Sequence, residues 1–501
     1  MTNTSNACMP FQNRFAQLPP QLFSEVQPTA VSRPQWIRFN EALATELGLD
    51  AVSLNTPAAA AIFAGNTLPD TAKPLAMTYA GHQFGHWVPQ LGDGRAVLLG
   101  DLLDIHDQYR EVQLKGAGIT PYSRSGDGRA WVGPVLREYI VSEAMAALGV
   151  PTTRALAAVL TGDQVFREGA MPGAIITRVA NSHVRVGTFQ YFIARDDLPA
   201  IDALMQHMIS TCYPEISDAA NPASALFSAV ISKQANLVAH WQSVGFIHGV
   251  MNTDNMAISG ETIDYGPCAF LDEYDPKKVF SSIDQMGRYA FANQPAAAQW
   301  NLSNFGQALL PFIDNDKDAA LAIAQSLLDE FPKRYQEAYN ERMLAKIGIS
   351  NQHGNDMELL TELLALMVES NADFTLTFTY LTNYQLTKLN PRITKPAIDI
   401  SPYYQAPSSL QAWHEKWQRR LTQQSTNSEQ QHTLMQQHNP VLIPRNHRIE
   451  ACIQSAVEND FEPFNELVNA MQRPYSTDQQ YSHLAEPPNE REVVKKTFCG
   501  T

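Results

Sequence analysis

The chain has 501 residues, of which 44% are hydrophobic and 17% charged, and its formal net charge is −15. This composition is ordinary for a globular protein, and its acidity argues against a nucleic-acid partner, whose phosphates require a basic face. No apolar run reaches the roughly 18 residues that a membrane span needs. The N-terminus lacks the pattern of a secretion signal.

The five cysteines are widely spaced and form no Cys-x-x-Cys pair. This suits a reducing compartment and argues against a zinc site, so we expect a cytoplasmic protein. A chain of this length exceeds one typical core and should divide into roughly two or three lobes.

Residues 1–75 are rich in Pro, Ala and Asn. We expect an irregular extension there, with a helix near residues 39–47, packed on the main body. Residues 79–87 are dense in Gly, His and aromatic side chains. His82 and His86 stand four apart on a possible helix, which is more typical of packing than of a metal site, because no third ligand is signalled.

A glycine turn precedes the predicted strand 96–99. Gly92 and Gly94 would let the backbone approach phosphate oxygens, and Arg95 adds a fixed cation, although a simple hairpin turn explains the glycines equally well. The next strand, residues 111–115, ends at Lys115. A lysine in this position either reaches a phosphate or is an ordinary exposed residue at a strand end.

A helix is predicted over residues 135–148, with Gly149 as its cap. It carries Glu138 and Glu143. We expect Glu138, in the first full turn, to pair with Lys115; the alternative is ordinary solvated helix charge.

Two arginines stand in an apolar setting at the end of a predicted strand pair, 155–160 and 173–179, one inside the second strand and one after it. Arg178 and Arg185 are either buried ion-pair partners or ligands for a polyphosphate, since guanidinium geometry suits both.

Residues 246–267 concentrate polar side chains between apolar flanks. Asn255 and Asp264 stand on either side of two predicted short strands and a turn at Ser259-Gly260. Such a hairpin would let both share one cation, and magnesium takes one or two protein carboxylates and completes its shell with water and phosphates. The segment therefore indicates nucleotide chemistry.

Helices are predicted through the rest of the chain, with Pro-, Asn- and Gln-rich linkers such as residues 423–439 and a mobile tail over 485–501. The expected helices cover residues 225–243, 299–312, 318–339 (bent at Pro332), 357–369, 408–420 and 448–471.

The order of these features can be compared with the protein-kinase plan. That plan places a base Asp two residues after a His and a metal-binding Asn seven after it, then Asp-Phe-Gly. Here His248 is followed by Asn255 at the required spacing and by Asp264-Tyr-Gly, but Val250 replaces the base. Val97 also stands where a third loop glycine belongs. The pattern indicates a kinase-like site with altered chemistry.

Taken together, the motifs closely resemble the selenoprotein O family of kinase-like protein adenylyltransferases. They span most of residues 75–300 and are Tyr79-Ala-Gly-His-Gln-Phe-Gly, Leu91-Gly-Asp-Gly-Arg95, Gln113-Leu-Lys-Gly-Ala-Gly118, Tyr122-Ser-Arg-Ser-Gly-Asp-Gly-Arg129, Leu136-Arg-Glu-Tyr139, His248-Gly-Val-Met-Asn-Thr-Asp-Asn-Met256 and Asp264-Tyr-Gly-Pro267.

The resemblance implies transfer of AMP from ATP to Ser, Thr or Tyr hydroxyls of other proteins, with release of pyrophosphate, or of UMP from UTP. It implies a nucleotide flipped relative to ordinary kinases, Asp254 as proton acceptor, and magnesium or manganese on Asn255 and Asp264. The residues implied in nucleotide binding are Gly92, Gly94, Arg95, Lys115, Asp127, Gly128, Glu138, Arg178, Arg185 and Asp264.

It also implies an α+β, bilobal kinase-like fold. We expect an N-terminal extension (1–75), a small β-rich N-lobe with a helix (76–190), a larger helical C-lobe (191–350) and a helical C-terminal extension (351–501). Relatives carry selenocysteine near the C-terminus, and the hypothesis that follows is a redox pair between Cys499 and Cys268; an inert tail thiol is the alternative.

Two other functions stay open. A nucleotide-binding pseudokinase scaffold would explain Val250, although Lys115, Asn255 and Asp264 are retained. An ordinary kinase using Asp254 would transfer the γ-phosphate instead.

Overall fold

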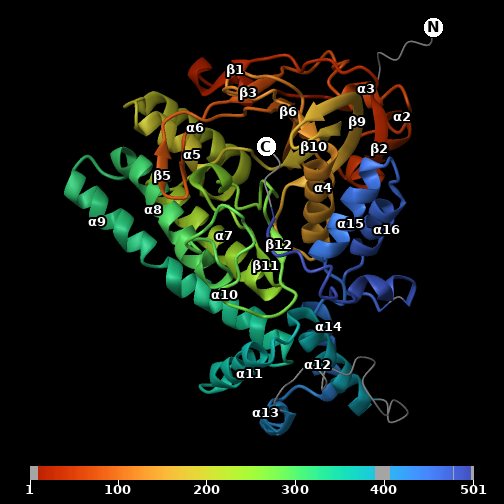
Figure 1. Ribbon diagram of the computed structural model, residues 1–501. Coiled ribbons are helices and arrows are strands. Elements are labelled where there is room, and N and C mark those ends of the chain that lie inside the picture. The colour runs from red at the N-terminus through yellow and green to blue at the C-terminus, as the bar shows by residue number, and fades with distance from the viewer. Residues whose placement is uncertain (1–8, 390–406, 478, 498–501) are drawn as a thin grey trace.

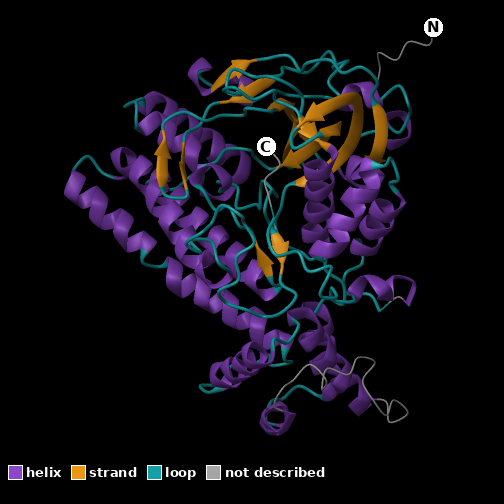
Figure 2. Cartoon of the chain, in the orientation of Figure 1, coloured by secondary structure: helices purple, strands orange, loops and turns teal. Residues whose placement is uncertain are grey.

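The computed structural model describes residues 9–389, 407–477 and 479–497. The fold is mixed α+β, as expected, with most strands gathered at one end of the molecule and helices forming the rest (Figure 1, Figure 2). The strand pair β11 and β12 lies near the centre of the view, between the sheet and the helices (Figure 1).

The main sheet is antiparallel. Within the described residues it has eight strands in the order β1-β3-β6-β7-β10-β9-β2, with β8 paired to β10. Their bounds are β1 Phe23–Glu25, β2 Gln35–Phe39, β3 Leu75–Met77, β6 Ala96–Leu103, β7 Tyr109–Lys115, β8 Ala130–Trp131, β9 Arg154–Phe166 and β10 Ala170–Ala180.

The N-terminal 75 residues are more regular than predicted. Their strands β1 and β2 join the sheet, β1 on β3 and β2 on β9. The rings of Trp36, Phe39 and Phe63 pack within 5.6 Å of one another, which explains why this segment is ordered despite its composition. Three short helices complete it, α1 Glu41–Glu46, α2 Ala51–Leu54 and α3 Ala60–Phe63.

The register of the central strands brings the predicted phosphate-binding residues together. β7 lies between β6 and β10, with Lys115 opposite both Ala96 and Ile176. Arg178 lies opposite Gln113 on the same pair. Three segments therefore lie close together on the sheet: the glycine turn before β6, the end of β7 and the middle of β10.

One long helix, α4 (Val132–Ala147), packs against this sheet and begins three residues earlier than predicted. Its other side is covered by α15 (Asn446–Val457) and α16 (Glu462–Met471) from the far end of the chain, as Figure 1 shows. The ring of Tyr139 meets Phe464 edge-on at 5.6 Å. Burial on both sides explains why most of α4 is apolar.

The helical part is built around α7, which carries apolar side chains such as Trp241 into the core. The predicted bent helix over 318–339 is wrong, because the chain breaks at residues 329–330 and starts a new helix. Pro332 lies in the first turn of that helix, where a missing N–H is tolerated. The helices are α5 Val186–Ile193, α6 Leu198–Cys212, α7 Pro222–Ser243, α8 Gln294–Ile313, α9 Lys317–Leu328 and α10 Phe331–Lys346.

The C-terminal region contains more helix than predicted. Residues 423–439, expected to be a linker, contain α14 (Ser428–His438), and residues 448–471 form two helices instead of one. Asn427 caps α14 by accepting a hydrogen bond from the Gln430 N–H, a local signal that the Gln-rich composition obscured. The other helices here are α11 Asp356–Ser370, α12 Phe374–Leu389 and α13 Pro407–Thr422. No helix in the described parts of the chain is long and apolar enough to cross a membrane.

The described part of the tail is anchored, contrary to the predicted mobile segment. The Thr497 hydroxyl donates to the Pro267 carbonyl at 2.6 Å, and its N–H donates to the Phe280 carbonyl at 2.8 Å. Ser282 N–H donates in turn to the Thr497 carbonyl at 3.2 Å. The tail thus lies along the loop that follows Asp264-Tyr-Gly.

Candidate active site

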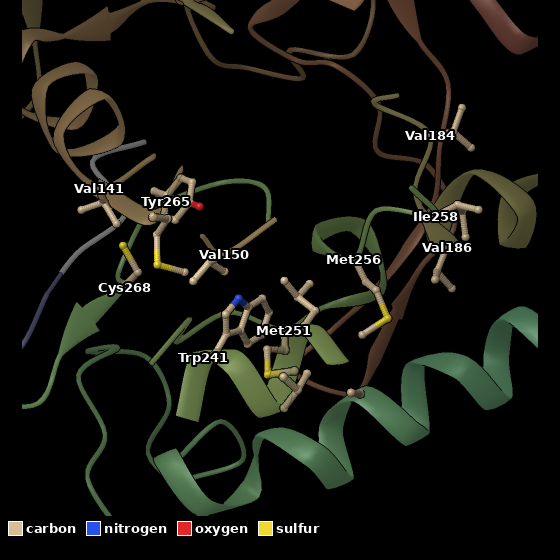
Figure 3. Close-up of a cluster of buried hydrophobic side chains, with 14 of the residues drawn as sticks. Val141, Val150, Val184, Val186, Trp241, Met251, Met256, Ile258, Tyr265 and Cys268 are labelled. Atoms are coloured by element: carbon tan, nitrogen blue, oxygen red, sulfur yellow. The ribbon is translucent and has the colours of Figure 1, made fainter. Parts of the chain in front are cut away.

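The polar segment 246–267 crosses the middle of the molecule from strand β11 (Phe246–Ile247), which pairs with β12 (Ala269–Phe270). Figure 3 shows apolar side chains of this segment, among them Met251, Met256 and Tyr265, within a buried cluster. His248 is fully buried, and its Nε2 lies 2.9 Å from the Ile263 carbonyl. Its contacts are therefore structural.

The predicted hairpin over residues 256–263 does not form. Ala257 bridges to Arg185 and Thr262 bridges to Thr152 instead, because the segment finds backbone partners in other parts of the chain. Asn255 and Asp264 nevertheless line the same cleft.

Asp264 is the meeting point of three cations. Its Oδ1 lies 2.6 Å from Lys115 Nζ and 2.7 Å from Arg178 Nη1, and its Oδ2 lies 3.0 Å from Arg185 Nη1. Burial would raise the pKa of this carboxyl, but the three cations outweigh it and hold the pKa well below its usual range. Asp264 has a backbone φ of +65°, the left-handed region that Asp tolerates better than most residues.

Glu138 forms the predicted pair with Lys115, at 2.7 Å. It also lies 3.3 Å from Arg178. Glu143 instead pairs with Arg154 at 2.9 Å. Helix α4 thus fixes the position of the strand-end lysine through one carboxylate.

Arg178 and Arg185 are both almost completely buried. Arg178 is oriented by Gln113, whose Oε1 lies 2.5 Å from Nη2. Arg185 lies over the Tyr79 ring and donates to the Asp254 carbonyl at 2.8 Å. In this structure both are ion-pair partners of Asp264, and both also line the cleft.

Asp254 lies in a one-turn helix next to Asn255 and is 7% exposed. Burial raises its pKa to about 6, against the attraction of Arg185. Its Oδ2 accepts a hydrogen bond from Gln83 Nε2 at 3.3 Å. Its Oδ1 has no hydrogen-bond partner among the residues that the structure describes.

A small hairpin from the N-terminal half holds this carboxylate. Its strands are β4 (Gly81–Gln83) and β5 (His86–Val88), so His82 and His86 lie on paired strands and not on a helix. His82 N–H donates to Thr253 Oγ1 at 2.7 Å. A Cβ at Gly81 would lie 2.5 Å from Asp254 Oδ1, so the close approach requires glycine.

Two loops close the cleft on the sheet side. Gly92, with φ of +116°, lies against the Tyr122 ring. In the second loop, Asp127 pairs with Arg167 at 2.9 Å, and Gly128, with φ of +65°, passes too close to the Gly118 carbonyl for any side chain. Contacts within the protein therefore determine the conformation of these loops, whether or not a ligand is bound.

The cleft between these elements encloses about 670 Å³. Glu138 lies behind Lys115, outside its lining. The lining contains the other predicted residues, namely Gly92, Gly94, Arg95, Lys115, Asp127, Gly128, Arg178, Arg185, Asp254, Asn255 and Asp264.

Sequence reasoning missed several polar residues of the cleft. Gln83, Asp93 and Arg167 all line it. The signal for Gln83 is its place in the motif Tyr79-Ala-Gly-His-Gln-Phe-Gly, in which sequence reasoning considers only the two histidines.

The oxygen donors of the cleft fit a hard divalent ion. Asn255 Nδ2 donates to the Val250 carbonyl at 3.1 Å, which fixes the amide and leaves its Oδ1 as an acceptor in the cleft that Asp264 also lines. Across the described ranges no group of three or more His, Cys, Asp or Glu side chains could hold a metal by itself. An ion here would draw its remaining ligands from water and phosphate oxygens.

The predicted redox pair cannot be placed. Cys268 is buried in the loop after Asp264-Tyr-Gly, and Cys499 lies outside the described residues. The pairing stays a hypothesis.

Comparison with known proteins identifies relatives of the chain. A family model described as "Protein adenylyltransferase SelO" matches residues 6–472. The chain is 52% identical over 496 residues to a protein nucleotidyltransferase YdiU of Bradyrhizobium sp. (strain ORS 278), covering 98% of this chain and 99% of that protein. It is 51% identical over 500 residues to a protein of the same name from Rhizobium johnstonii, covering 100% and 99%.

Proposed function

This chain belongs to the protein adenylyltransferase SelO family, and on that premise we propose that it transfers AMP from ATP to Ser, Thr or Tyr hydroxyls of other proteins. The observation that carries the proposal is the placement of Asp254, a carboxylate with one unpartnered oxygen, in the same cleft as a cluster of buried phosphate-binding cations. That combination suits transfer to a hydroxyl.

The cations would hold the triphosphate. Lys115, Arg178 and Arg185 converge within 3.0 Å of the Asp264 carboxylate, so their positions are already fixed when a nucleotide arrives. Preorganised cations stabilise developing charge without reorganisation at the moment of reaction. Arg95 and the glycine loop at Gly92 and Gly94 would complete this phosphate site.

The other end of the nucleotide would lie against the second loop. Asp127 and Gly128 line the cleft there, and Arg167 holds Asp127 by an ion pair. Nothing in this loop selects adenine over uracil, so UMP transfer from UTP belongs to the same proposal.

Asp254 would act as the general base. The Asp254 carboxylate takes the proton of the acceptor hydroxyl while the acceptor oxygen bonds to the α-phosphorus. The bond from the α-phosphorus to its bridging oxygen breaks, and pyrophosphate leaves with the electron pair. A pKa near 6 places Asp254 closer to working pH than an ordinary carboxylate, which favours proton transfer.

Asn255 and Asp264 would hold magnesium or manganese. The ion supplies positive charge that neutralises the phosphate oxygens when it is bound. Asp264 would divide its carboxylate between the ion and the cations, and the Val250 carbonyl keeps the Asn255 amide oriented.

We interpret the arrangement as bilobal and kinase-like. The sheet with α4 is the smaller lobe, and the helices around α7 form the larger one. In this interpretation Val250, which lines the cleft, occupies the usual base position, and Asp254 replaces it from a different point of the same loop.

The test is intact-mass analysis of candidate protein substrates, and of the chain itself, after incubation with ATP and magnesium or manganese. The proposal predicts a gain of one AMP, lost in Asp254→Asn. A gain of one phosphate would make the protein an ordinary kinase. Binding of ATP without any mass gain on a library of proteins would favour the scaffold.

A further inference from the structure

A second cavity lies behind the Lys115–Glu138 pair and encloses about 340 Å³. It shares Arg95, Lys115 and Gly266 with the nucleotide cleft. Its other walls come from the start of α4, from Glu450 and Ile453 of α15, from Tyr265 and from tail residues 494–497. The two cavities therefore adjoin each other at the same two cations.

The back cavity is cationic, although the chain as a whole is strongly acidic. Its two carboxylates, Glu138 and Glu450, are already paired, one with Lys115 and the other with Arg137. The five cationic side chains in its lining are Arg95, Lys115, Arg137, Lys495 and Lys496.

Arg137 carries the most specific signal. It is 5% exposed, and its Nη2 donates to Glu450. Its Nη1 is buried and has no hydrogen-bond partner anywhere in the described parts of the chain. An unpaired buried guanidinium N–H is costly, so an anion in the cavity would satisfy it.

The start of α4 faces the same space. Gly133 and Pro134 in its first turn line the cavity, and no side chain caps the helix at Trp131. The N-terminus of a helix of 16 residues presents backbone N–H groups and the positive end of its dipole. This feature and Arg137 favour an anion independently of each other.

The tail lysines are held in place. Thr497 is hydrogen-bonded to Pro267, Phe280 and Ser282, so the preceding Lys495 and Lys496 stay at the mouth of the cavity. Neither lysine forms an ion pair with a carboxylate of the described residues. They remain available to an anion.

We propose that the back cavity binds the pyrophosphate released by nucleotidyl transfer. The inference rests on the proposed function. The attacking hydroxyl and the leaving pyrophosphate lie on opposite sides of the α-phosphorus in an in-line displacement. With Asp254 on the side of the acceptor, the leaving group departs toward Arg95 and Lys115, beyond which the cavity opens. The site separates the product from the reacting centre before it escapes past the tail.

The experiment is calorimetric titration of sodium pyrophosphate into the full-length protein saturated with a non-hydrolysable ATP analogue. We expect pyrophosphate to bind this loaded protein, and Lys495→Ala/Lys496→Ala to weaken that binding about tenfold. Affinity for the analogue itself should stay within about twofold. The matched control, Lys277→Ala/Lys278→Ala, removes the same charge from residues that line neither cavity.

Two results would overturn the proposal. Pyrophosphate that binds only the nucleotide-free protein would occupy the triphosphate position of the main cleft. Equal affinity in the tail variant and its control would show that the lysines take no part. Because binding is measured without turnover, a protein that binds pyrophosphate in this way but transfers no AMP would refute the proposed function separately.

Discussion

Asp264 compensates much of the positive charge of the cleft, because three buried or half-buried cations form ion pairs with its carboxylate. Replacing one partner of such a cluster leaves the others uncompensated. The same carboxylate is the only acidic side chain that we assign to the metal ion. Its removal should therefore affect catalysis far more than the loss of a surface charge.

We predict that Asp264→Asn lowers the rate of AMP transfer on the order of a thousandfold. Initial rates at saturating ATP would measure this. Asp318→Asn, at the exposed start of α9, is the matched control and should leave the rate unchanged. A rate within a factor of about three of the parent protein would contradict the role of Asp264.

Gln83 positions the base in our account, because its amide donates to Asp254 Oδ2 and so orients the carboxylate. We predict that Gln83→Ala lowers kcat about tenfold with little change in KM for ATP. His86→Ala, an exposed residue of the same hairpin, is the control. An equal loss of kcat in both variants would mean that the loss comes from disturbing the hairpin and not from removing the hydrogen bond to Asp254.

Lys346 is a buried cation outside the site. Its Nζ donates to the His438 carbonyl at 3.2 Å and lies over the Phe378 ring, and no carboxylate of the described residues pairs with it. Burial lowers its pKa from 10.5 to about 7. Between these two values the unfolded chain binds a proton that the folded chain does not, so the free energy of unfolding rises with pH across that range.

Lys346→Met should therefore stabilise the protein by about 2 kcal/mol near pH 7, after the lost hydrogen bond is subtracted. The gain should shrink as the pH approaches 10. Thermal melting of both proteins at several pH values would measure it. A gain that is constant with pH would show that the lysine is not neutralised by burial.

At the residue scale, the candidate residues that the sequence alone can name are those with a local pattern. Lys115, Asn255 and Asp264 sit in short motifs with fixed spacing. Gln83 was missed because its bond to Asp254 spans 171 residues. No local pattern reports a contact at that distance.

At the scale of elements, α4 connects the site to the C-terminal region. It carries Glu138 on one side and packs against α15 and α16 on the other. The C-terminal helices thus hold the Lys115–Glu138 pair in place from behind.

We predict that Phe464→Ala, which removes a ring packed on Tyr139, destabilises the protein by about 3 kcal/mol. It should also weaken ATP binding, because α4 can then shift away from Lys115. Melting curves and nucleotide titration would test both effects. The control is Val457→Ala, at the exposed end of α15; normal ATP affinity in a destabilised Phe464→Ala protein would contradict the connection.

The predicted elements that were right have strong local signals. β7 and α4 follow clear alternation and capping patterns. The N-terminal strands β1 and β2 were missed because their stability comes from pairing with distant strands. The same holds for the expected hairpin at 256–263, whose residues pair with Arg185 and Thr152 instead of with each other.

At the scale of the whole molecule, the cleft and the rest of the chain differ in the sign of their charge. The chain has a net charge of −15, yet seven Lys and Arg side chains line the candidate cleft beside four Asp residues. This separation directs an anionic nucleotide to one place on the molecule. The acidic remainder favours acceptor proteins with basic surfaces, a preference that should weaken as salt is added.

The most direct test of the account compares two labels in one reaction. Candidate substrates are incubated with ATP radiolabelled on either the α- or the γ-phosphate, and the label on protein is counted. The account predicts incorporation from the α-label alone, and none in Asp254→Asn. Incorporation from the γ-label would contradict it and identify the protein as a kinase.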